Sequence, residues 1–459
     1  MTPRLRSGRT YHDDSPWPHL DLGPHDDRRY FEQLIKAIFQ AGLRWPVIES
    51  RWTAFGEVFH GFDPVAVAAM TEQDVDRAAR DPRIIRHHRK IADAVASTRT
   101  FGADGWSSVR AMVLDRIGGP LAVRVVRDPD PPPGGIVVQV LATGMCRSDW
   151  HAWAGHDEIR LPHVPGHELA GVVSAVGDGV SRWSVGDRVT VPFVQGCGRC
   201  RWCRSGNAQV CPEQEQPGFT QWGSFAEYVA LYAADANVVG LPEAVTFEAA
   251  AALGCRFATS YRALTGRARL TADEWVTVVG AGGAGLSAVM IAKALGARVI
   301  AVDRNPGALA AASALGADHV LTADGSRDIP GSVLELTAGG SHVAIDAVGS
   351  EQTCADSILS LRRRGRHVQV GLLPPVGGHP RVPMARVIGW ELDLLGSHGM
   401  AAADYPGMLA LIERGELLPQ ALIERVISLD EAAALLPTFD TAAPAGMTMI
   451  DPRRSPQPS

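Results

Sequence analysis

The 459-residue sequence predicts an α/β protein in which a small β-barrel and a doubly wound parallel sheet follow a partial all-α segment. Three observations support this fold class. Residues 1–107 show helical periodicity, residues 109–194 contain repeated short β-like runs, and residues 275–303 read as strand, glycine turn, helix and strand. At about 150 residues per domain, the length fits two to four domains.

The composition narrows the class of protein. An apolar content of 46% and a charged content of 20% are ordinary for a globular chain, and the net charge of −6 gives no sign of general nucleic-acid affinity. The longest apolar run, 276–292, contains four glycines and therefore reads as strand, turn and helix rather than as a membrane span. The first residues lack an apolar signal-peptide region, so we expect a cytoplasmic protein with no membrane partner.

The first 107 residues predict helices. Apolar residues recur at spacings of three and four in two stretches, 31–39 and 84–95. Between these stretches, Thr71 is a helix cap with Asp74 three residues later, which predicts a helix that starts at this point.

The same region carries a series of motifs in register. They are Tyr11-His12-Asp13, Asp26-Asp27-Arg28, Phe31-Glu32, Gln40-Ala41-Gly42-Leu43-Arg44-Trp45, Phe62-Asp63-Pro64-Val65 and Ile84-Ile85-Arg86-His87. In this order they resemble the opening of the 3-methyladenine DNA glycosylase I family. The resemblance covers residues 11 to about 103, which is the first half of that family's domain.

We expect this glycosylase-like segment to be inactive. Ala37 stands where the family carries a glutamate, and the second half of the family's domain is missing. Residues 1–107 hold 15 Lys and Arg against 15 Asp and Glu, without the basic excess typical of a DNA-binding domain. The alternative interpretation is a retained DNA-binding module.

Three separated residues predict a catalytic metal site. The predicted strand 136–140 leads into Cys146, and His167 and Cys255 follow within glycine-containing motifs. Two thiolates and an imidazole can bind zinc and leave the fourth position open for substrate. The alternative is two buried core cysteines and a histidine in a turn.

Four further cysteines predict a structural zinc site. Cys197, Cys200, Cys203 and Cys211 have the spacing C-x2-C-x2-C-x7-C, and four thiolates this close form a closed tetrahedral site. Two disulfides are the alternative interpretation.

Residues 275–303 predict a dinucleotide-binding fold, because G-x-G-x-x-G lies between a buried strand and a helix. Asp303, which ends the next strand, can accept hydrogen bonds from the ribose hydroxyls and so favours NAD over NADP. The neighbouring Arg304 weakens this preference, because an arginine there could reach a 2′-phosphate. The predicted cofactor-binding residues are Gly280, Gly282, Gly283, Gly285, Asp303 and Arg304.

In this order, the motifs between residues 109 and 452 resemble those of the zinc-dependent alcohol dehydrogenases of the medium-chain dehydrogenase/reductase superfamily. The resemblance implies a GroES-like catalytic domain over 109–256, a Rossmann NAD-binding domain over 257–395 and a C-terminal return to the catalytic domain over 396–452. It also implies one catalytic and one structural Zn²⁺, NAD, an alcohol or aldehyde as substrate, and a homodimer or homotetramer.

The resemblance also assigns roles to single residues. Glu168 would be a neighbour or transient ligand of the catalytic zinc, Asp149 would orient His167, and Phe193 would line the substrate pocket. Trp150 and Trp153 are further candidates for an apolar pocket. Arg256 departs from the family, which often has a small residue beside the second cysteine.

The expected reaction is reversible hydride transfer between an alcohol and NAD. Zinc that binds the alcohol oxygen lowers its pKa, so that an alkoxide forms near neutral pH. Ser148 and His151 would pass the released proton to solvent by way of the cofactor ribose. The alternatives are a polyol or aldehyde-adduct dehydrogenase, or a DNA-repair or DNA-binding protein fused to a dehydrogenase.

Overall fold

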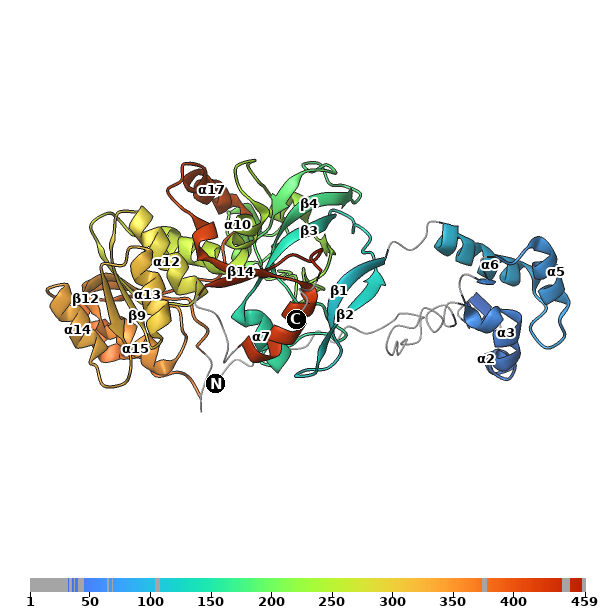
Figure 1. Cartoon of the computed structure of the whole chain (residues 1–459), viewed down its shortest axis with the longest axis horizontal. Coiled ribbons are helices and arrows are strands. Elements are labelled where there is room, and N and C mark those ends of the chain that lie inside the picture. Colours follow the sequence, from blue (N-terminus) through green and yellow to red (C-terminus); the bar gives the residue numbers. More distant parts are fainter. Residues whose placement is uncertain are drawn as a thin grey trace. The chain divides into compact units, whose positions relative to one another are not determined.

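The computed structural model describes residues 32, 35–36, 38–39, 45–63, 66–67, 69–103, 108–373, 378–439 and 446–455. Its contacts divide the chain into two compact units, 1–107 and 108–459. Figure 1 shows the order of the elements along each unit. Within the described ranges, no helix combines the length and apolar character needed to cross a bilayer.

The first unit is helical and has its own apolar core, as the periodicity predicts. Its elements are α2 (Trp45–Glu49), α3 (Trp52–Val58), η1 (His60–Phe62), α5 (Glu72–Arg80) and α6 (His88–Ala103). The predicted helix start at Thr71 is confirmed, because Thr71 and Asp74 form a reciprocal capping box. The predicted helix over 84–95 begins later, at His88, and Ile84 is buried in the loop before it. Most of the motif residues before Trp45, including Tyr11 and Ala37, lie outside the described ranges.

The second unit begins with the expected strands. A seven-stranded sheet has the order β14-β15-β3-β4-β5-β7, with β6 paired to β3, and β1 and β2 form a separate hairpin. The strands are β1 (Ser108–Leu114), β2 (Leu121–Arg127), β3 (Ile136–Met145), β4 (Glu168–Val176), β5 (Arg188–Thr190), β6 (Tyr228–Leu231), β7 (Val239–Gly240), β14 (Ile423–Ile427) and β15 (Met447–Ile450). Because β15 pairs with the end of β3, the C-terminal segment returns to the sheet that carries Cys146.

The other sheet is six-stranded, wholly parallel and ordered β10-β9-β8-β11-β12-β13. Its strands are β8 (Trp275–Val279), β9 (Arg298–Asp303), β10 (His319–Thr322), β11 (Ser341–Asp346), β12 (Leu361–Gln369) and β13 (Asp393–Gly396). The intervening helices are α12 (Gly283–Ala294), α13 (Pro306–Ala314), α14 (Ile329–Leu336), α15 (Glu351–Leu359) and α16 (Met384–Trp390). The strand order reverses next to β8, which is the usual place for a ligand in such a sheet.

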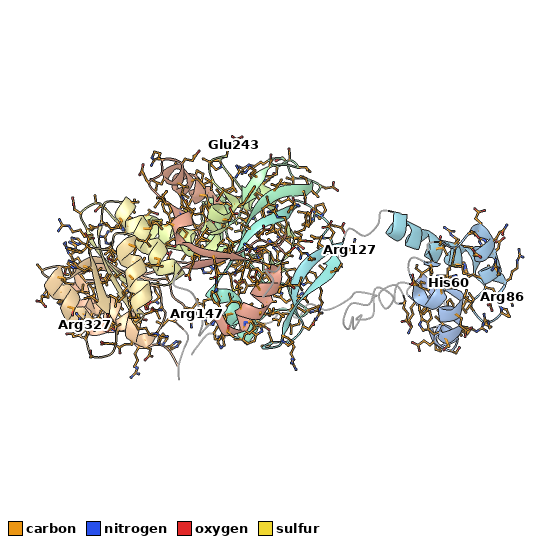
Figure 2. All side chains as sticks on the ribbon, viewed as in Figure 1. His60, Arg86, Arg127, Arg147, Glu243 and Arg327 are labelled. Atoms are coloured by element: carbon orange, nitrogen blue, oxygen red, sulfur yellow. The ribbon has the colours of Figure 1, made fainter. Side chains whose placement is uncertain are left out.

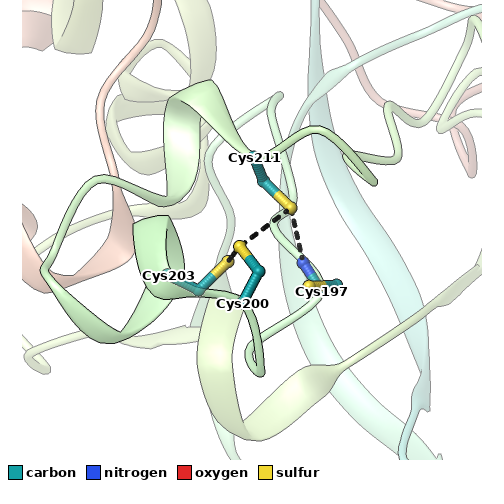
Figure 3. A group of neighbouring side chains, drawn as sticks. All are labelled: Cys197, Cys200, Cys203 and Cys211. Carbon is teal, nitrogen blue, oxygen red and sulfur yellow. Dashed lines mark hydrogen bonds between the residues drawn. The ribbon is translucent and has the colours of Figure 1, made fainter.

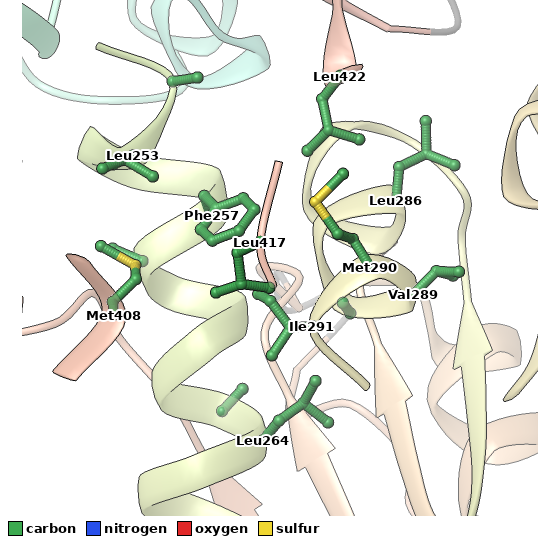
Figure 4. Close-up of a cluster of buried hydrophobic side chains, with 14 of the residues drawn as sticks. Leu253, Phe257, Leu264, Leu286, Val289, Met290, Ile291, Met408, Leu417 and Leu422 are labelled. Atoms are coloured by element: carbon green, nitrogen blue, oxygen red, sulfur yellow. The ribbon is translucent and has the colours of Figure 1, made fainter. Parts of the chain in front are cut away.

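A continuous helical run joins the two sheets. It consists of α10 (Phe247–Ala251), η3 (Leu253–Phe257), α11 (Ala258–Arg262) and η4 (Ala263–Arg267), of which η3 and η4 are π-helical. Figure 4 shows Phe257 and Leu264 of this run on the side that faces Ile291 of α12, within a buried apolar cluster that also contains Leu253 and Leu286. The packing fixes the run, and hence Cys255 within it, against the glycine turn before α12.

The remaining helices of the second unit are short. They are α7 (Arg147–Ala154), α8 (Arg201–Arg204), η2 (Ala208–Val210), α9 (Ala234–Asn237), η5 (Ala402–Asp404), α17 (Tyr405–Glu413), η6 (Pro419–Leu422), α18 (Leu429–Leu435) and η7 (Leu436–Thr438).

Candidate active site

The first candidate ligand stands at the junction of β3 and α7. Cys146 is the N-cap of α7, and its backbone N–H donates to Oδ2 of Asp149 at 2.8 Å. The other carboxylate oxygen, Oδ1, accepts from the backbone N–H of Gly166 at 3.2 Å and lies 2.9 Å from Nδ1 of His167. Asp149 therefore fixes the positions of Cys146 and His167 relative to each other.

Four side chains converge at this point. Cys146, His167, Glu168 and Cys255 each offer one ligand atom, and these atoms all lie within 4.8 Å of one another. The Nε2 atom of His167 is buried without a hydrogen-bond partner, while Nδ1 is held by Asp149. An orphaned ring nitrogen beside two sulfurs is the donor set that a tetrahedral zinc with one open position requires.

The electrostatics of the site favour a cation. The Cys255 thiol is the largest influence that lowers the pKa of Cys146, and Cys146 in turn raises the pKa of Cys255 well above its usual value. Burial alone would lower the pKa of His167, but the carboxylate of Asp149 and the sulfur of Cys146 together outweigh burial and raise this pKa well above its usual value. Burial also raises the pKa of Glu168. A divalent cation would relieve this concentration of acidic groups.

Glu168 has a partner that sequence reasoning did not assign to it. Oε1 accepts from Nε of Arg256 at 3.0 Å and from the Arg256 backbone N–H at 3.2 Å, and Nη2 of Arg256 donates to Oε2. Both carboxylate oxygens are thus engaged by one guanidinium. Gly144 leaves room for the pair, since a Cβ there would lie 2.1 Å from Oε2 of Glu168.

The four-cysteine lobe has the geometry of a closed metal site (Figure 3). All seven cysteines of the chain are free, so the alternative of two disulfides is wrong. Sγ of Cys200 lies 3.5 Å from that of Cys203 and 3.7 Å from that of Cys211, and the four sulfurs form one group within 4.8 Å. Sulfurs about 2.3 Å from a central zinc would be about 3.8 Å apart at tetrahedral corners, which agrees with these separations.

The glycine turn between β8 and α12 leaves space for a dinucleotide. Gly280 has φ +94°, in the left-handed region, and a Cβ on Gly285 would lie 1.7 Å from the Gly280 carbonyl oxygen. A Cβ on Gly282 would meet no atom of the described residues within 4 Å. The first and third glycines are therefore required by the packing of the turn, whereas the second borders open space at the N-terminus of α12, where phosphates bind.

Asp303 lies at the end of β9 beside this turn. Its Oδ2 accepts from the Ala281 backbone N–H at 2.6 Å, and its Oδ1 accepts from the Asn305 N–H at 2.8 Å. The carboxylate is thereby fixed at the edge of the glycine turn. The adjacent Arg304 is exposed.

The two candidate relay residues lie on one face of α7. Ser148 and His151 are three residues apart and both are half-buried, and Oγ of Ser148 lies 3.8 Å from Sγ of Cys146. Nδ1 of His151 lies 2.8 Å from Nδ1 of the exposed His156. Burial, and then His156 and the exposed Arg147 (Figure 2), lower the pKa of His151, so that it is neutral near pH 7.

Aromatic rings border the candidate metal site. The ring of Phe193 lies 6.0 Å from that of His167, and Phe219, which the sequence did not single out, lies 5.2 Å from it. His398 in turn lies 5.4 Å from Phe193. Trp150 and Trp153, the other candidates for an apolar pocket, are both partly buried. They pack against the apolar cluster that includes Leu429 and Leu436, and their part in a substrate pocket stays a prediction.

Three parts of the chain match known protein families. Residues 132–243 match the family described as alcohol dehydrogenase GroES-like domain, and residues 283–414 match the zinc-binding dehydrogenase family. Residues 5–105 match the methyladenine glycosylase family.

Individual relatives agree. An alcohol dehydrogenase from Geobacillus stearothermophilus is 38% identical over 271 residues, which cover 58% of this chain and 78% of that protein. A crystal structure of an NAD-dependent alcohol dehydrogenase is 30% identical with a TM-score of 0.67, over 74% of this chain and 99% of that one. A cobalt- and zinc-bound alcohol dehydrogenase from Pyrobaculum aerophilum is 30% identical with a TM-score of 0.65, over 75% and 100% of the two chains.

Proposed function

This chain belongs to the zinc-binding alcohol dehydrogenases, and on that premise we propose that it oxidises an alcohol to an aldehyde or ketone with a catalytic zinc and NAD. The observation that carries the proposal is the convergence of Cys146, His167 and Cys255, with the buried Nε2 of His167 left unpaired. Cobalt and zinc in one structural relative, and NAD-dependence in another, support the same pair of cofactors.

The two cofactors supply Lewis acidity, which makes the alcohol hydroxyl more acidic, and a hydride acceptor. Cys146, His167 and Cys255 would hold the zinc, and Asp149 keeps the proton of His167 on Nδ1 so that Nε2 is available. Glu168 serves as a fixed counter-charge rather than as a standing ligand, because Arg256 occupies both of its oxygens.

The proton of the alcohol leaves through residues of α7. Ser148 is placed beside Cys146, and His151 lies one turn further along α7, half-buried, with a pKa lowered first by burial. A neutral imidazole can accept the proton near pH 7. His151 in turn contacts His156, which is exposed and can release the proton to solvent.

The site best fits an alcohol with an apolar substituent. Phe193 and Phe219 border the ring of His167, so the substituent next to the reacting carbon meets aromatic surface. For the dinucleotide, a carboxylate at Asp303 favours the free ribose hydroxyls of NAD over a 2′-phosphate.

The rest of the chain has supporting roles in this proposal. The four-cysteine lobe binds a second, structural zinc, and the glycosylase-like segment has no activity of its own. Free thiols throughout support a cytoplasmic location. The enzyme is a homodimer or homotetramer with no nucleic-acid partner.

The direct test is the formation of reduced nicotinamide from NAD and a panel of aliphatic, aromatic and polyhydroxy alcohols. The zinc-loaded chain should turn over at least one apolar alcohol, and Cys146→Ser should abolish turnover while the lobe keeps its zinc. Turnover of polyols alone would reject the substrate class, and equal turnover by Cys146→Ser would reject the metal site.

A further inference from the structure

Arg256 forms a buried ion pair beside the candidate metal ligands. It is 9% exposed, and its partner Glu168 is fully buried. The backbone N–H, Nε and Nη2 all donate to the Glu168 carboxylate. Because a buried carboxylate without a partner is costly, the position of Glu168 depends on where this guanidinium is held.

The opposite edge of the same guanidinium lies against the glycine turn. A Cβ on Gly283, the first residue of α12, would lie 2.6 Å from Cδ of Arg256 and 3.1 Å from its Nη1. Position 283 must therefore be glycine for Arg256 to fit. Among the described residues, Nη1 donates to no acceptor, although the other donor groups of Arg256 are bonded to Glu168.

The unbonded edge faces the place where a dinucleotide phosphate would lie. The 12-residue helix α12 begins at Gly283, and the neighbouring Gly282 borders open space. A guanidinium is planar and presents its donors in a fixed fork, so one arginine can hold two acceptors on different edges.

We propose that Arg256 is a positioning residue that links the dinucleotide site to the metal centre. Its Nη1 donates to a phosphate oxygen at the start of α12, while Nε and Nη2 hold Glu168 behind Cys146 and Cys255. The inference rests on the proposed zinc- and NAD-dependent function and adds a residue outside the glycine motif to it.

Binding at one site then strengthens binding at the other. Arg256 directly follows Cys255, so a phosphate that immobilises its side chain also restrains the helical run that carries this ligand. Release of the metal must break its bond to Cys255, so restraint of this run slows the release. Linkage requires the reverse effect as well, so bound metal raises the affinity for the dinucleotide.

The experiment measures two quantities on the zinc-loaded full chain. The first is the Kd of ADP-ribose, which has the pyrophosphate but no nicotinamide. The second is the rate of zinc loss to a colorimetric chelator, with and without ADP-ribose. The kinetic phase that disappears in Cys146→Ser belongs to the site in question.

Typical coupling between sites changes an affinity about fivefold or more. Because affinity differences lie mostly in the rate of release, we expect ADP-ribose to slow this phase in wild type by about the same factor. Arg256→Met should raise the Kd of ADP-ribose about tenfold and abolish the protection, since a charge-assisted hydrogen bond is lost. Arg256→Lys keeps the charge but not the fork, so it should bind ADP-ribose more weakly than wild type and lose the protection.

Arg262→Met is the matched control. Arg262 lies on the same helical run and pairs with a carboxylate, Asp404 at 3.9 Å, so its removal should change neither quantity. Arg256→Met leaves the buried Glu168 carboxylate with the backbone N–H but without its guanidinium. The double variant Glu168→Gln/Arg256→Met therefore serves if the single variant does not fold, and it should show the same two losses.

Unchanged ADP-ribose affinity and unchanged protection in Arg256→Lys and in the folded Met variant would overturn the inference while leaving the proposed function intact. Failure of wild type to bind ADP-ribose would overturn the proposed dinucleotide site and the inference with it.

Discussion

Nδ1 of His167 lies 2.9 Å from Oδ1 of Asp149, and both side chains are fully buried. This contact sets the tautomer of the imidazole: with a carboxylate as acceptor, the proton is on Nδ1 and the lone pair is on Nε2. In the proposed zinc site, the availability of Nε2 of His167 therefore depends on Asp149, which is not itself a proposed ligand.

Asp149→Asn tests this dependence. The amide has one oxygen, which can still accept from the Cys146 N–H, and its nitrogen then takes the place of Oδ1. From there it donates to Nδ1 and so shifts the proton to Nε2, and it no longer accepts from the Gly166 N–H. We expect the affinity of the three-ligand site for zinc to fall about 10–100-fold, the usual effect of losing such a partner. Competition against a chelator of known affinity measures it. Unaltered zinc affinity would show that Asp149 only caps the helix.

Loss of one lobe cysteine should separate stability from catalysis. In Cys200→Ser the zinc content should fall from about two per chain to about one. The thermal midpoint should drop by at least about 5 °C, or roughly 2 kcal/mol for a domain of this size. Turnover at low temperature should persist, since the lobe holds no reacting group. Metal analysis measures the zinc content, and calorimetry measures the thermal midpoint. A variant that keeps two zinc ions would exclude the four-cysteine lobe as a zinc site.

The proton path predicts a pH dependence. Burial, His156 and Arg147 lower the pKa of His151, so the imidazole is neutral and able to accept a proton at pH 7, and loses this capacity as the pH falls through the lowered pKa. Alcohol oxidation by wild type should therefore decline on the acid side, below the usual histidine range. His151→Gln should reduce kcat about tenfold or more and remove this limb from the profile.

His156→Gln is the companion variant, because it removes the imidazole that His151 contacts but leaves His151 in place. It should shift the acid limb upward without abolishing turnover, since one of the groups that lower the pKa of His151 is gone. A His151→Gln profile that superimposes on wild type would remove His151 from the path.

Coenzyme preference provides a test of Asp303. Asp303→Asn keeps an acceptor for the Ala281 N–H but removes the negative charge that a 2′-phosphate would meet. The ratio of kcat/KM for NAD over NADP should fall about tenfold, which is roughly 1.4 kcal/mol. Steady-state kinetics with both coenzymes measures the ratio. If wild type already prefers NADP, the assignment of Asp303 is wrong and Arg304 decides the preference.

The first unit should be dispensable for the dehydrogenase. Its buried residues form a separate apolar cluster, and the strands of the second unit start only at Ser108. Removal of residues 1–107 should leave kcat and zinc content unchanged. The full chain should release no methylated base from alkylated DNA. Release of base would show that this segment is an active glycosylase.

Short-range patterns account for most of what the sequence predicts. The four-cysteine site and the glycine turn at Gly280 are each predicted by residue spacing within a single short segment. Strands β3 and β4 are predicted by their apolar runs. Glu168 and Arg256 are 88 residues apart in the sequence, and Phe219 contacts His167 from another loop. A local sequence pattern therefore predicts neither contact. The arginine beside Cys255 was visible as a departure from its family, but its partner was not.

The central claim is that Cys146, His167 and Cys255 share a zinc ion beside the glycine turn. Anomalous diffraction at the zinc absorption edge, from crystals of the full chain grown with zinc, tests it most directly. The account predicts two strong peaks per chain, one among these three side chains and one within the four-cysteine lobe. A peak in the lobe with none between Cys146, His167 and Cys255 would contradict it.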